Sequence, residues 1–234
     1  MTLQVQGLTV QDGTRTAVQN VDLTVEPGKV TAVIGANGAG KSELVLALAG
    51  MLPVTAGTVL LDGKPLAARS PEAIRRAGIA AVPEGHRVLT DLSIDDNLRA
   101  AGSLIKGGLE ARLDDTYTIF PELAERKPQL AGTLSGGQQQ MVALAHALMC
   151  RPRYLLIDEM SLGLAPLIVK RLLGVVTDLK ARGTGILLIE QFTDLALGVA
   201  ESAIVLRGGK MRYNGPAEVL AKDAKRLHEA YFGE

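Results

Sequence analysis

Residues 35–42 read Gly35-Ala36-Asn37-Gly38-Ala39-Gly40-Lys41-Ser42 and fit the pattern G-x-x-x-x-G-K-[ST]. This stretch follows the apolar run Lys29–Ile34 and precedes a predicted helix over Ser42–Met51. Its glycines let the backbone wrap tightly so that several N–H groups face one anion, and the helix N-terminus adds partial positive charge. We therefore predict a phosphate-binding loop in which Lys41 reaches the terminal phosphates of a nucleotide and the Ser42 hydroxyl ligates Mg²⁺.

The rest of the chain alternates short strands and helices on both sides of a long helical stretch. Val30–Ile34, Leu155–Ile157 and Ile186–Ile189 are continuously apolar, as expected for parallel strands buried on both faces. Residues 3–10 and 16–25 alternate in polarity around a turn and predict an antiparallel N-terminal portion. The fold class is therefore α/β, with a mainly parallel core sheet and an inserted helical lobe. We expect a single domain over 1–234, in which residues 1–85 and 151–234 form the core and 86–150 form the lobe.

A pair of carboxylates follows a second apolar strand. Tyr154-Leu155-Leu156-Ile157 leads directly into Asp158 and Glu159. At the end of such a strand, Asp158 can hold the Mg²⁺ shell, and Glu159 can orient and deprotonate an attacking water. Phosphoryl transfer depends mainly on positioning and charge neutralisation, so a phosphate loop and two carboxylates suffice for it.

A second glycine-rich loop, Leu134-Ser135-Gly136-Gly137-Gln138, precedes the predicted helix Gln139–Met149. Ser135 and the two glycines at a helix start can receive an anion, although this loop has no lysine. By itself such a loop is usually a helix cap and turn. Its position about 20 residues before Asp158 and Glu159, in a chain with a phosphate loop, favours a role in nucleotide chemistry.

Composition excludes several other classes of protein. The 25 Lys and Arg residues balance 25 Asp and Glu residues, which argues against general nucleic-acid binding. The best candidate for a membrane span, Ile186–Leu206, contains three acidic residues and therefore does not fit a bilayer-spanning helix. The N-terminus carries no signal-like pattern, and the single cysteine, Cys150, fits a reducing compartment. From these features we expect a soluble, cytoplasmic protein.

In order and spacing, Gly35–Ser42, Leu134–Gln138 and Leu155–Glu159 resemble the Walker A, signature and Walker B motifs of ABC-type ATPases. The resemblance covers essentially the whole chain. It implies hydrolysis of ATP with Mg²⁺ as cofactor, in a dimer whose two ATPase domains pack head to tail. Each signature loop of such a dimer caps the ATP held by the other chain. By this resemblance Ser135, Gly136, Gly137 and Gln138 contact the partner's ATP.

Three further segments narrow the resemblance to the smaller ATPase subunit of branched-chain amino acid importers. They are Pro83-Glu84-Gly85-His86-Arg87, Ser161-Leu162-Gly163-Leu164-Ala165-Pro166 and Ile189-Glu190-Gln191. Urea and short-amide importers share much of this pattern and are the nearest alternative. The resemblance implies that Glu84 joins Ser42 and Asp158 around the metal, while Gln191 bonds the γ-phosphate or the attacking water.

The same resemblance implies a set of partners. These are a second ATPase subunit, identical or homologous, and membrane permease subunits that receive the energy of hydrolysis. A solute-binding protein outside the membrane would act indirectly. The chain would then lie peripherally on the cytoplasmic side of the cell membrane, with no nucleic acid as a partner.

Three positions depart from the family pattern. Gln11-Asp12 stand where an aromatic residue would stack on adenine, so we predict weak adenine selectivity unless Val18 supplies an apolar contact. Met160 replaces the proline after the catalytic glutamate, which should loosen that turn. Glu43 stands where threonine is common, and its carboxylate can approach the nucleotide or point to solvent.

Two other classes of function stay open at this stage. A non-transport ABC ATPase acting on nucleic acid or the ribosome usually carries two ATPase units or a coiled-coil insertion, and the sequence shows neither. A small-molecule kinase or a GTPase is the other alternative. A GTPase should contain an Asn-Lys-x-Asp motif, which is absent, and a kinase would not need the loop at Ser135–Gln138.

Overall fold

The computed structural model describes residues 2–66, 70–85, 88–103 and 107–233. Its N-terminal part is a four-stranded antiparallel sheet in the order β2-β1-β4-β5. The strands are β1 (Leu3–Asp12), β2 (Arg15–Val25), β4 (Val54–Leu61) and β5 (Lys64–Pro65). β1 pairs with both β2 and β4, and the register between β1 and β2 shifts between Val5 and Gln11. The predicted antiparallel portion is therefore confirmed.

The second sheet has six strands in the order β10-β9-β3-β8-β7-β6. All neighbours pair in parallel except β9 and β10, which form a hairpin. The strands are β3 (Val30–Ile34), β6 (Ile79–Val82), β7 (Tyr154–Asp158), β8 (Gly185–Ile189), β9 (Ser202–Arg207) and β10 (Lys210–Pro216). β3, β7 and β8 are buried throughout, which confirms the prediction from their continuous apolar runs.

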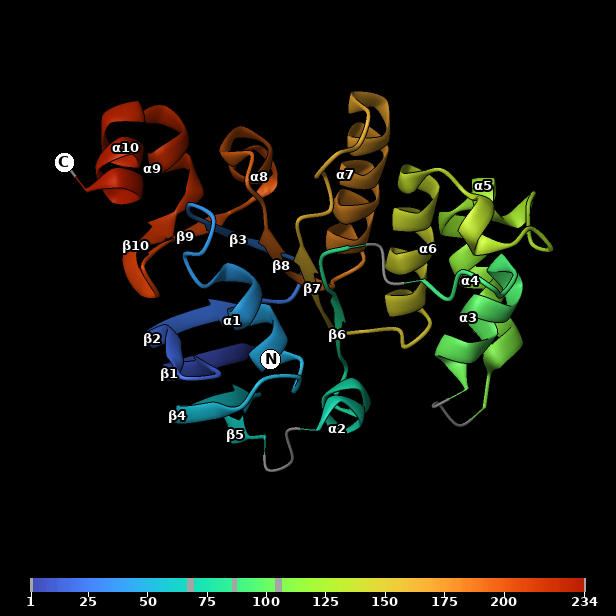
Figure 1. The fold of residues 1–234 in the computed structure, drawn as a ribbon, viewed down its shortest axis with the longest axis horizontal. Helices are drawn as coiled ribbons and strands as arrows, with labels where there is room; N and C mark the ends of the chain where they lie inside the picture. The colour runs from blue at the N-terminus through green and yellow to red at the C-terminus, as the bar shows by residue number, and fades with distance from the viewer. Residues whose placement is uncertain (1, 67–69, 86–87, 104–106, 234) are drawn as a thin grey trace.

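The core strands place successive side chains on opposite faces of the sheet. Leu156 of β7 packs with α1 (Lys41–Leu48) and the antiparallel sheet, whereas Leu155 packs with α7 (Pro166–Ala181). α8 (Thr193–Val199) and α9 (Ala217–Lys222) cover the far end of this second face, and α10 (Ala224–Phe232) closes the described chain. The core sheet therefore lies between two layers (Figure 1).

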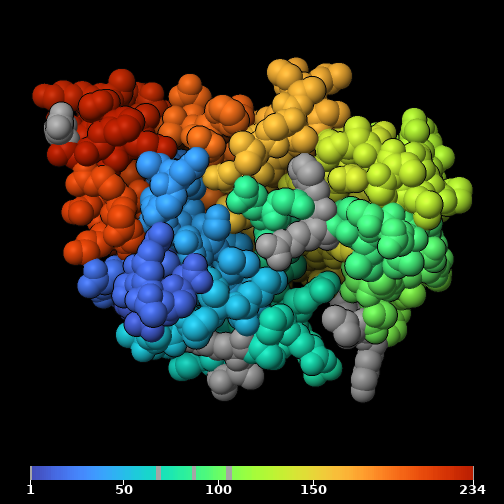
Figure 2. Space-filling view, in the orientation of Figure 1, coloured from blue at the N-terminus to red at the C-terminus, as the bar shows by residue number. Residues whose placement is uncertain are grey.

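A group of helices between β6 and β7 forms the other side of the molecule. It contains α3 (Ile94–Gly102), α4 (Leu109–Ile119), α5 (Pro121–Ala124), a 3₁₀ turn (Ala131–Thr133) and α6 (Gly136–Leu148). These helices share one hydrophobic cluster with β7 and α7, so the lobe is anchored on the core through α6. Figure 2 shows the lobe, green to yellow, on the side opposite the C-terminal helices, red. The boundaries at residues 86 and 150 stay a prediction.

The structure contains two elements, β5 and α2 (Pro71–Arg76), that were not predicted from the sequence. The strand β5 is only two residues long, too short to leave a periodic pattern. The helix α2 begins with a Ser70 cap whose hydroxyl accepts a 3.3 Å hydrogen bond from the Ala73 N–H, with proline at the first helical position. No helix in the described part of the chain is long and apolar enough to cross a membrane.

Candidate functional site

The loop between β3 and α1 owes its path to two glycines. A Cβ atom at Gly35 would lie 2.2 Å from the Leu206 carbonyl oxygen, and one at Gly40 would lie 2.4 Å from that of Ala17. Both glycines have positive φ, 156° and 101°. The loop is therefore pressed against two neighbouring strands and can take this path only without side chains at these positions.

Lys41, the first residue of α1, reaches back across this loop. Its Nζ donates hydrogen bonds to the carbonyl oxygens of Gly35 at 2.9 Å and Ala36 at 3.2 Å, and it lies 3.8 Å from Glu159 Oε1. The side chain is only 4% exposed. A cation so placed stands between the loop and the end of β7, where it can neutralise phosphate charge.

Asp158 ends β7 directly opposite the loop and is buried. Burial raises the pKa of its carboxyl to about 6; a hydrogen bond from Ser42 opposes this shift, and the charges of Glu159 and Glu84 add to it. Its Oδ1 atom finds no hydrogen-bond partner among the described residues. A buried carboxylate with an unpartnered oxygen, bonded to the predicted serine ligand, fits Mg²⁺, which binds through few carboxylates plus substrate phosphates.

Glu159 occupies a turn of unusual backbone geometry. Its φ is 48°, in the left-handed region that non-glycine residues seldom adopt, and its N–H donates a 3.0 Å hydrogen bond to the Ile189 carbonyl. The next residue, Met160, is 1% exposed and packs in the cluster shared by the lobe and the core. Met160 therefore fills core space beside the turn.

These groups surround a cleft of about 310 Å³. Its lining consists of Asn37, Gly38, Gly40, Lys41, Ser42, Glu43, Glu84, Glu159, Leu162 and Gln191. The structure thus brings together residues predicted from four separate segments of sequence, represented by Lys41, Glu84, Glu159 and Gln191. Gly35, Ala39 and Asp158 are buried just behind them. Leu162, which the sequence prediction left out, is 42% exposed, while His86 and Arg87 of the Glu84 segment lie outside the described residues.

One predicted contact is wrong in this structure. Val18 is fully buried in the core cluster, and its Cγ2 would lie 3.2 Å from a Cβ atom at Gly40. It packs beneath the phosphate loop and offers no surface to a base. A single apolar residue in a strand does not reveal which side of a loop it will face, so only packing could decide its role.

Two features of the site were missed from the sequence. Arg15, which begins β2, donates a 3.2 Å hydrogen bond from Nη2 to the Gly38 carbonyl and lies 3.6 Å from Glu43 Oε1. Glu43 therefore both lines the cleft and pairs with an arginine. The second feature is Glu190, which is 1% exposed and accepts a 2.5 Å hydrogen bond from Ser161. Burial raises the pKa of Glu190 to about 7, and the nearby charges of Glu159 and Asp158 add to this shift.

The loop Ser135–Gln138 lies apart from the cleft. Ser135 caps α6, where its hydroxyl accepts a 3.4 Å hydrogen bond from the Gln138 N–H and its own N–H donates to Gln138 Oε1 at 3.0 Å. Ser135 and Gly136 are exposed, while Gly137 packs so tightly on α7 that a Cβ atom would lie 2.8 Å from Ile168. No residue of this loop is among those that line the cleft.

Comparison with known proteins identifies this class of site. The family of ABC transporter domains matches residues 18–161, which contain the phosphate loop, the Ser135 loop and both carboxylates. A solved ATP-binding cassette of an ABC transporter in its ADP conformation superposes with a TM-score of 0.85 at 27% identity, over 100% of both chains. The chain therefore belongs to the ABC transporter family, and it is an ATPase.

Two relatives are similar over most of their length. The high-affinity branched-chain amino acid transport ATP-binding protein BraG of Pseudomonas aeruginosa is 38% identical, over 93% of each chain. The probable branched-chain amino acid transport ATP-binding protein LivF of Archaeoglobus fulgidus is 36% identical, over 88% of each chain. The predicted family is confirmed by these matches.

Proposed function

We propose that this chain is the ATP-hydrolysing subunit of an importer for branched-chain amino acids. The observation that carries the ATPase role is the cleft at which Lys41 and Ser42, from the start of α1, meet Asp158 and Glu159, from the end of β7. The names of the two relatives support the solute. An importer of urea or short amides is the alternative, since an ATPase subunit does not itself touch the solute.

The chemistry follows from the positions of the charged groups. Lys41 neutralises the terminal phosphates, and Glu159, held in place by its backbone bond to Ile189, orients a water and accepts its proton as the water attacks the γ-phosphate. Gln191, on the cleft wall, bonds that water or the γ-phosphate. ADP and phosphate leave. Mg²⁺, held by Ser42 and Asp158 with Glu84 nearby, would neutralise charge on the β- and γ-phosphates.

A second ATPase subunit would complete the site. In this proposal the exposed N-terminus of α6, with Ser135, Gly136, Gly137 and Gln138, caps ATP bound by the partner in a head-to-tail dimer. The separation of this loop from the chain's own cleft supports that arrangement, because within one chain the loop does not line the cleft. The partner is an identical chain or a homologous one.

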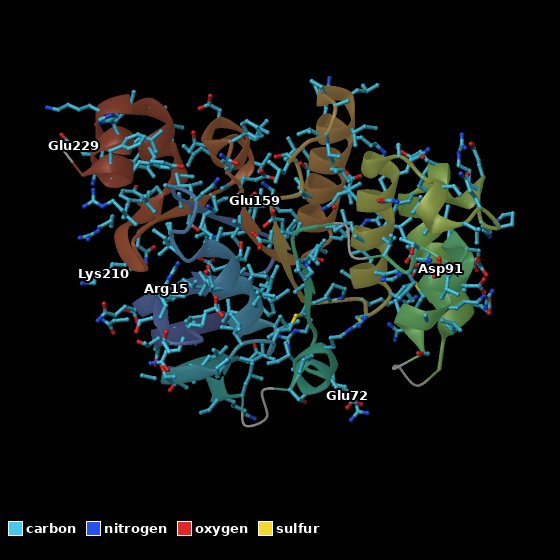
Figure 3. All side chains as sticks on the ribbon, viewed as in Figure 1. Arg15, Glu72, Asp91, Glu159, Lys210 and Glu229 are labelled. Atoms are coloured by element: carbon cyan, nitrogen blue, oxygen red, sulfur yellow. The ribbon has the colours of Figure 1, made fainter. Side chains whose placement is uncertain are left out.

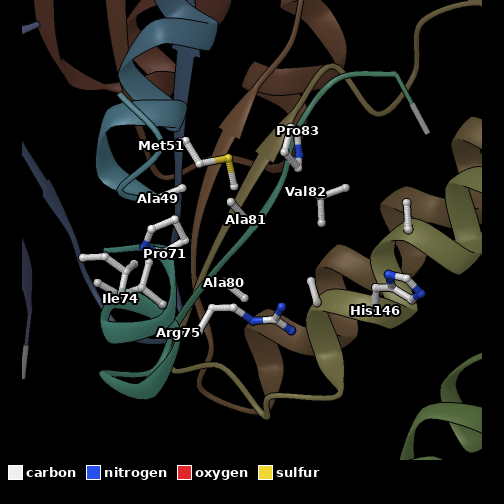
Figure 4. Close-up of a pocket in the computed structure, with 13 residues that line it drawn as sticks. Ala49, Met51, Pro71, Ile74, Arg75, Ala80, Ala81, Val82, Pro83 and His146 are labelled. Atoms are coloured by element: carbon white, nitrogen blue, oxygen red, sulfur yellow. The ribbon is translucent and has the colours of Figure 1, made fainter. Parts of the chain in front are cut away.

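A groove between the core and the lobe is proposed as the docking site of a membrane permease. It has a volume of about 130 Å³ and is lined by the turn after α1, by α2, by β6 and by α6, with Met51, Ile74, Val82 and His146 among its walls (Figure 4). An apolar groove next to Pro83 and Glu84 suits a short helix whose movement reaches the cleft. The chain would then sit peripherally on the cytoplasmic side of the membrane, with a solute-binding protein acting indirectly.

The experiment that tests this function is reconstitution into vesicles with the permease subunits of a branched-chain amino acid importer. We expect leucine, isoleucine or valine, delivered by the cognate binding protein, to stimulate ATP hydrolysis and to accumulate in the vesicles. If urea stimulates ATP hydrolysis and the branched-chain amino acids do not, the proposed solute is wrong and the ATPase role stands. If none of the permease subunits binds the chain, the importer role is contradicted.

A further inference from the structure

Arg15 is held at the outer rim of the phosphate loop. Its Nη2 donates a 3.2 Å hydrogen bond to the Gly38 carbonyl, and the same atom lies 3.6 Å from Glu43 Oε1. Both contacts use the same nitrogen, Nη2, at one end of the guanidinium group. The side chain nevertheless stays 59% exposed, so much of its surface is accessible to a ligand. Figure 3 labels Arg15 on the N-terminal hairpin.

The backbone of β2 fixes this position. The Ala17 carbonyl lies so close to the loop that a Cβ atom at Gly40 would meet it at 2.4 Å, and one at Gly209 would meet it at 2.6 Å. Arg15 comes two residues before Ala17 on the same strand. The hairpin therefore packs directly against the phosphate loop, and the backbone of Arg15 is held within reach of Gly38.

The direction of the nucleotide brings its base toward this hairpin. Lys41 and Glu159 stand 3.8 Å apart at the inner end of the cleft, where the terminal phosphates belong. A nucleotide with its phosphates at that end would extend its nucleoside toward the outer side of the loop, where Arg15 of β2 contacts Gly38. A Cβ atom at Gly38 would meet no atom within 4 Å, so there is open space at this rim.

We propose that the Arg15 guanidinium stacks on the purine base of the bound nucleotide. The hairpin from Leu3 to Val25 contains no aromatic residue that could do this. A planar guanidinium stacks on π-systems, and the contacts of Nη2 with Gly38 and Glu43 keep this group beside the loop. Because every purine has a π-face, such a platform binds adenine and guanine alike. The proposal rests on nucleotide binding in this cleft.

The test compares ligands with and without a base. Binding of ADP, GDP and inorganic pyrophosphate is measured by calorimetry in the presence of Mg²⁺, for the wild-type chain and for Arg15→Ala. We expect Arg15→Ala to weaken ADP and GDP about 10-fold each, since base stacking contributes at this scale, and to leave pyrophosphate unchanged. Unchanged pyrophosphate binding also shows that the variant is folded around an intact loop.

Two further variants of Arg15 separate the effect of a planar side chain from that of its charge, and a third variant is a control. Arg15→Tyr keeps a flat side chain and should retain affinity for ADP, whereas Arg15→Lys keeps the charge and should lose affinity as Arg15→Ala does. Arg76→Ala is the matched control, because Arg76 is also exposed and paired with a carboxylate, Glu72, but lies on α2. It should bind all three ligands normally.

Two results would overturn the proposal. If Arg15→Ala weakens pyrophosphate as much as ADP and Arg15→Lys restores both, then Arg15 is a phosphate ligand. If ADP binding is unaffected in Arg15→Ala while the wild-type chain binds ADP, then Arg15 makes no contact with the nucleotide. Absence of ADP binding by the wild-type chain would overturn the proposed function together with this inference.

Discussion

Ser161 Oγ donates a 2.5 Å hydrogen bond to Glu190 Oε2, and both side chains are buried. Ser161 lies two residues after Glu159, at the start of the loop that follows β7, and Glu190 lies one residue before Gln191, after β8. This bond and the one from the Glu159 N–H to the Ile189 carbonyl connect the end of β7 to the end of β8. The segments that follow these strands carry Glu159 and Gln191, which are expected to position the attacking water. The relative positions of Glu159 and Gln191 therefore depend on Glu190.

Loss of this link should slow hydrolysis more than it weakens binding. We expect Glu190→Ala to lower kcat on the order of 10-fold with little change in KM for ATP, because misplaced catalytic groups cost rate while the phosphate loop stays intact. Glu190→Gln still offers an oxygen to Ser161 and should keep most of the activity. Steady-state ATPase kinetics check this. A loss confined to KM would show that Glu190 supports binding instead.

Glu190 should also make stability depend on pH. Its pKa rises from 4.5 to about 7 on folding, mainly through burial, so between these values the folded chain keeps a proton that the unfolded chain has lost. Stability from this group is therefore present below pH 4.5 and falls as the pH rises toward 7. Glutamine does not titrate, so the Glu190→Gln variant does not lose this stability as the pH rises. Between pH 4.5 and about 7, its free energy of unfolding relative to wild type should therefore increase by up to about 3 kcal/mol.

Urea unfolding of both proteins at several pH values measures that difference. Glu72→Gln, at an exposed glutamate on α2, serves as the control and should follow the wild-type curve. A difference between Glu190→Gln and wild type that stays constant with pH would mean that Glu190 has an ordinary pKa.

Glu159→Gln tests the identity of the general base. The variant keeps the size and hydrogen-bonding capacity of the side chain but cannot accept a proton, so turnover should fall by about 100-fold or more. ATP binding should persist, because Lys41 and Ser42 are unchanged, and the ATP-bound variant should accumulate as a dimer. ATPase assays and light scattering with ATP measure the two effects. Rapid hydrolysis by this variant would show that another group is the base.

The Ser135 loop should act only between chains. We expect the ATPase rate per molecule to increase with protein concentration, and Ser135→Ala to abolish most activity without weakening nucleotide binding to the monomer. Ser135→Ala also removes a helix cap, which costs about 1 kcal/mol, so thermal melting must accompany the assay. Ser135→Thr keeps the cap and is the folding control. A rate per molecule that is independent of concentration, with a fully active Ser135→Ala, would exclude the dimer.

The groove of Figure 4 should bind the permease through apolar contact. Met51 is 46% exposed on its wall, so Met51→Glu places a charge there without disturbing the core. We expect this variant to lose co-purification with the permease subunits while its own ATPase activity is unchanged. Ala221→Glu adds the same charge at an exposed position on α9 and should bind normally. Equal binding by both variants would place the permease elsewhere.

Much of the fold and the site could be predicted because the signals are local. A continuously apolar strand predicts the parallel sheet, and Gly35–Ser42 predicts the phosphate loop. The glycines, the lysine and the start of the helix that such a loop needs all lie within these eight residues. Asp158 and Glu159 follow their strand in the same way. The parallel sheet, the antiparallel hairpin and the Ser135 helix start were each evident from a short periodic or capping pattern.

Contacts across long sequence separations depended on tertiary structure. Val18 turned out to lie beneath the loop, because the packing of β2 against Gly40 decides which side of the loop a residue faces. Arg15 meets Gly38 and Glu43 for the same reason. The carboxyl of Glu190 is buried beside Ser161 only because β7 and β8 are neighbours. The sequence by itself determined which chemical groups this protein possesses, since they belong to local backbone motifs. Only the folded chain decided which of them touch, because burial and proximity arise when distant strands pack together.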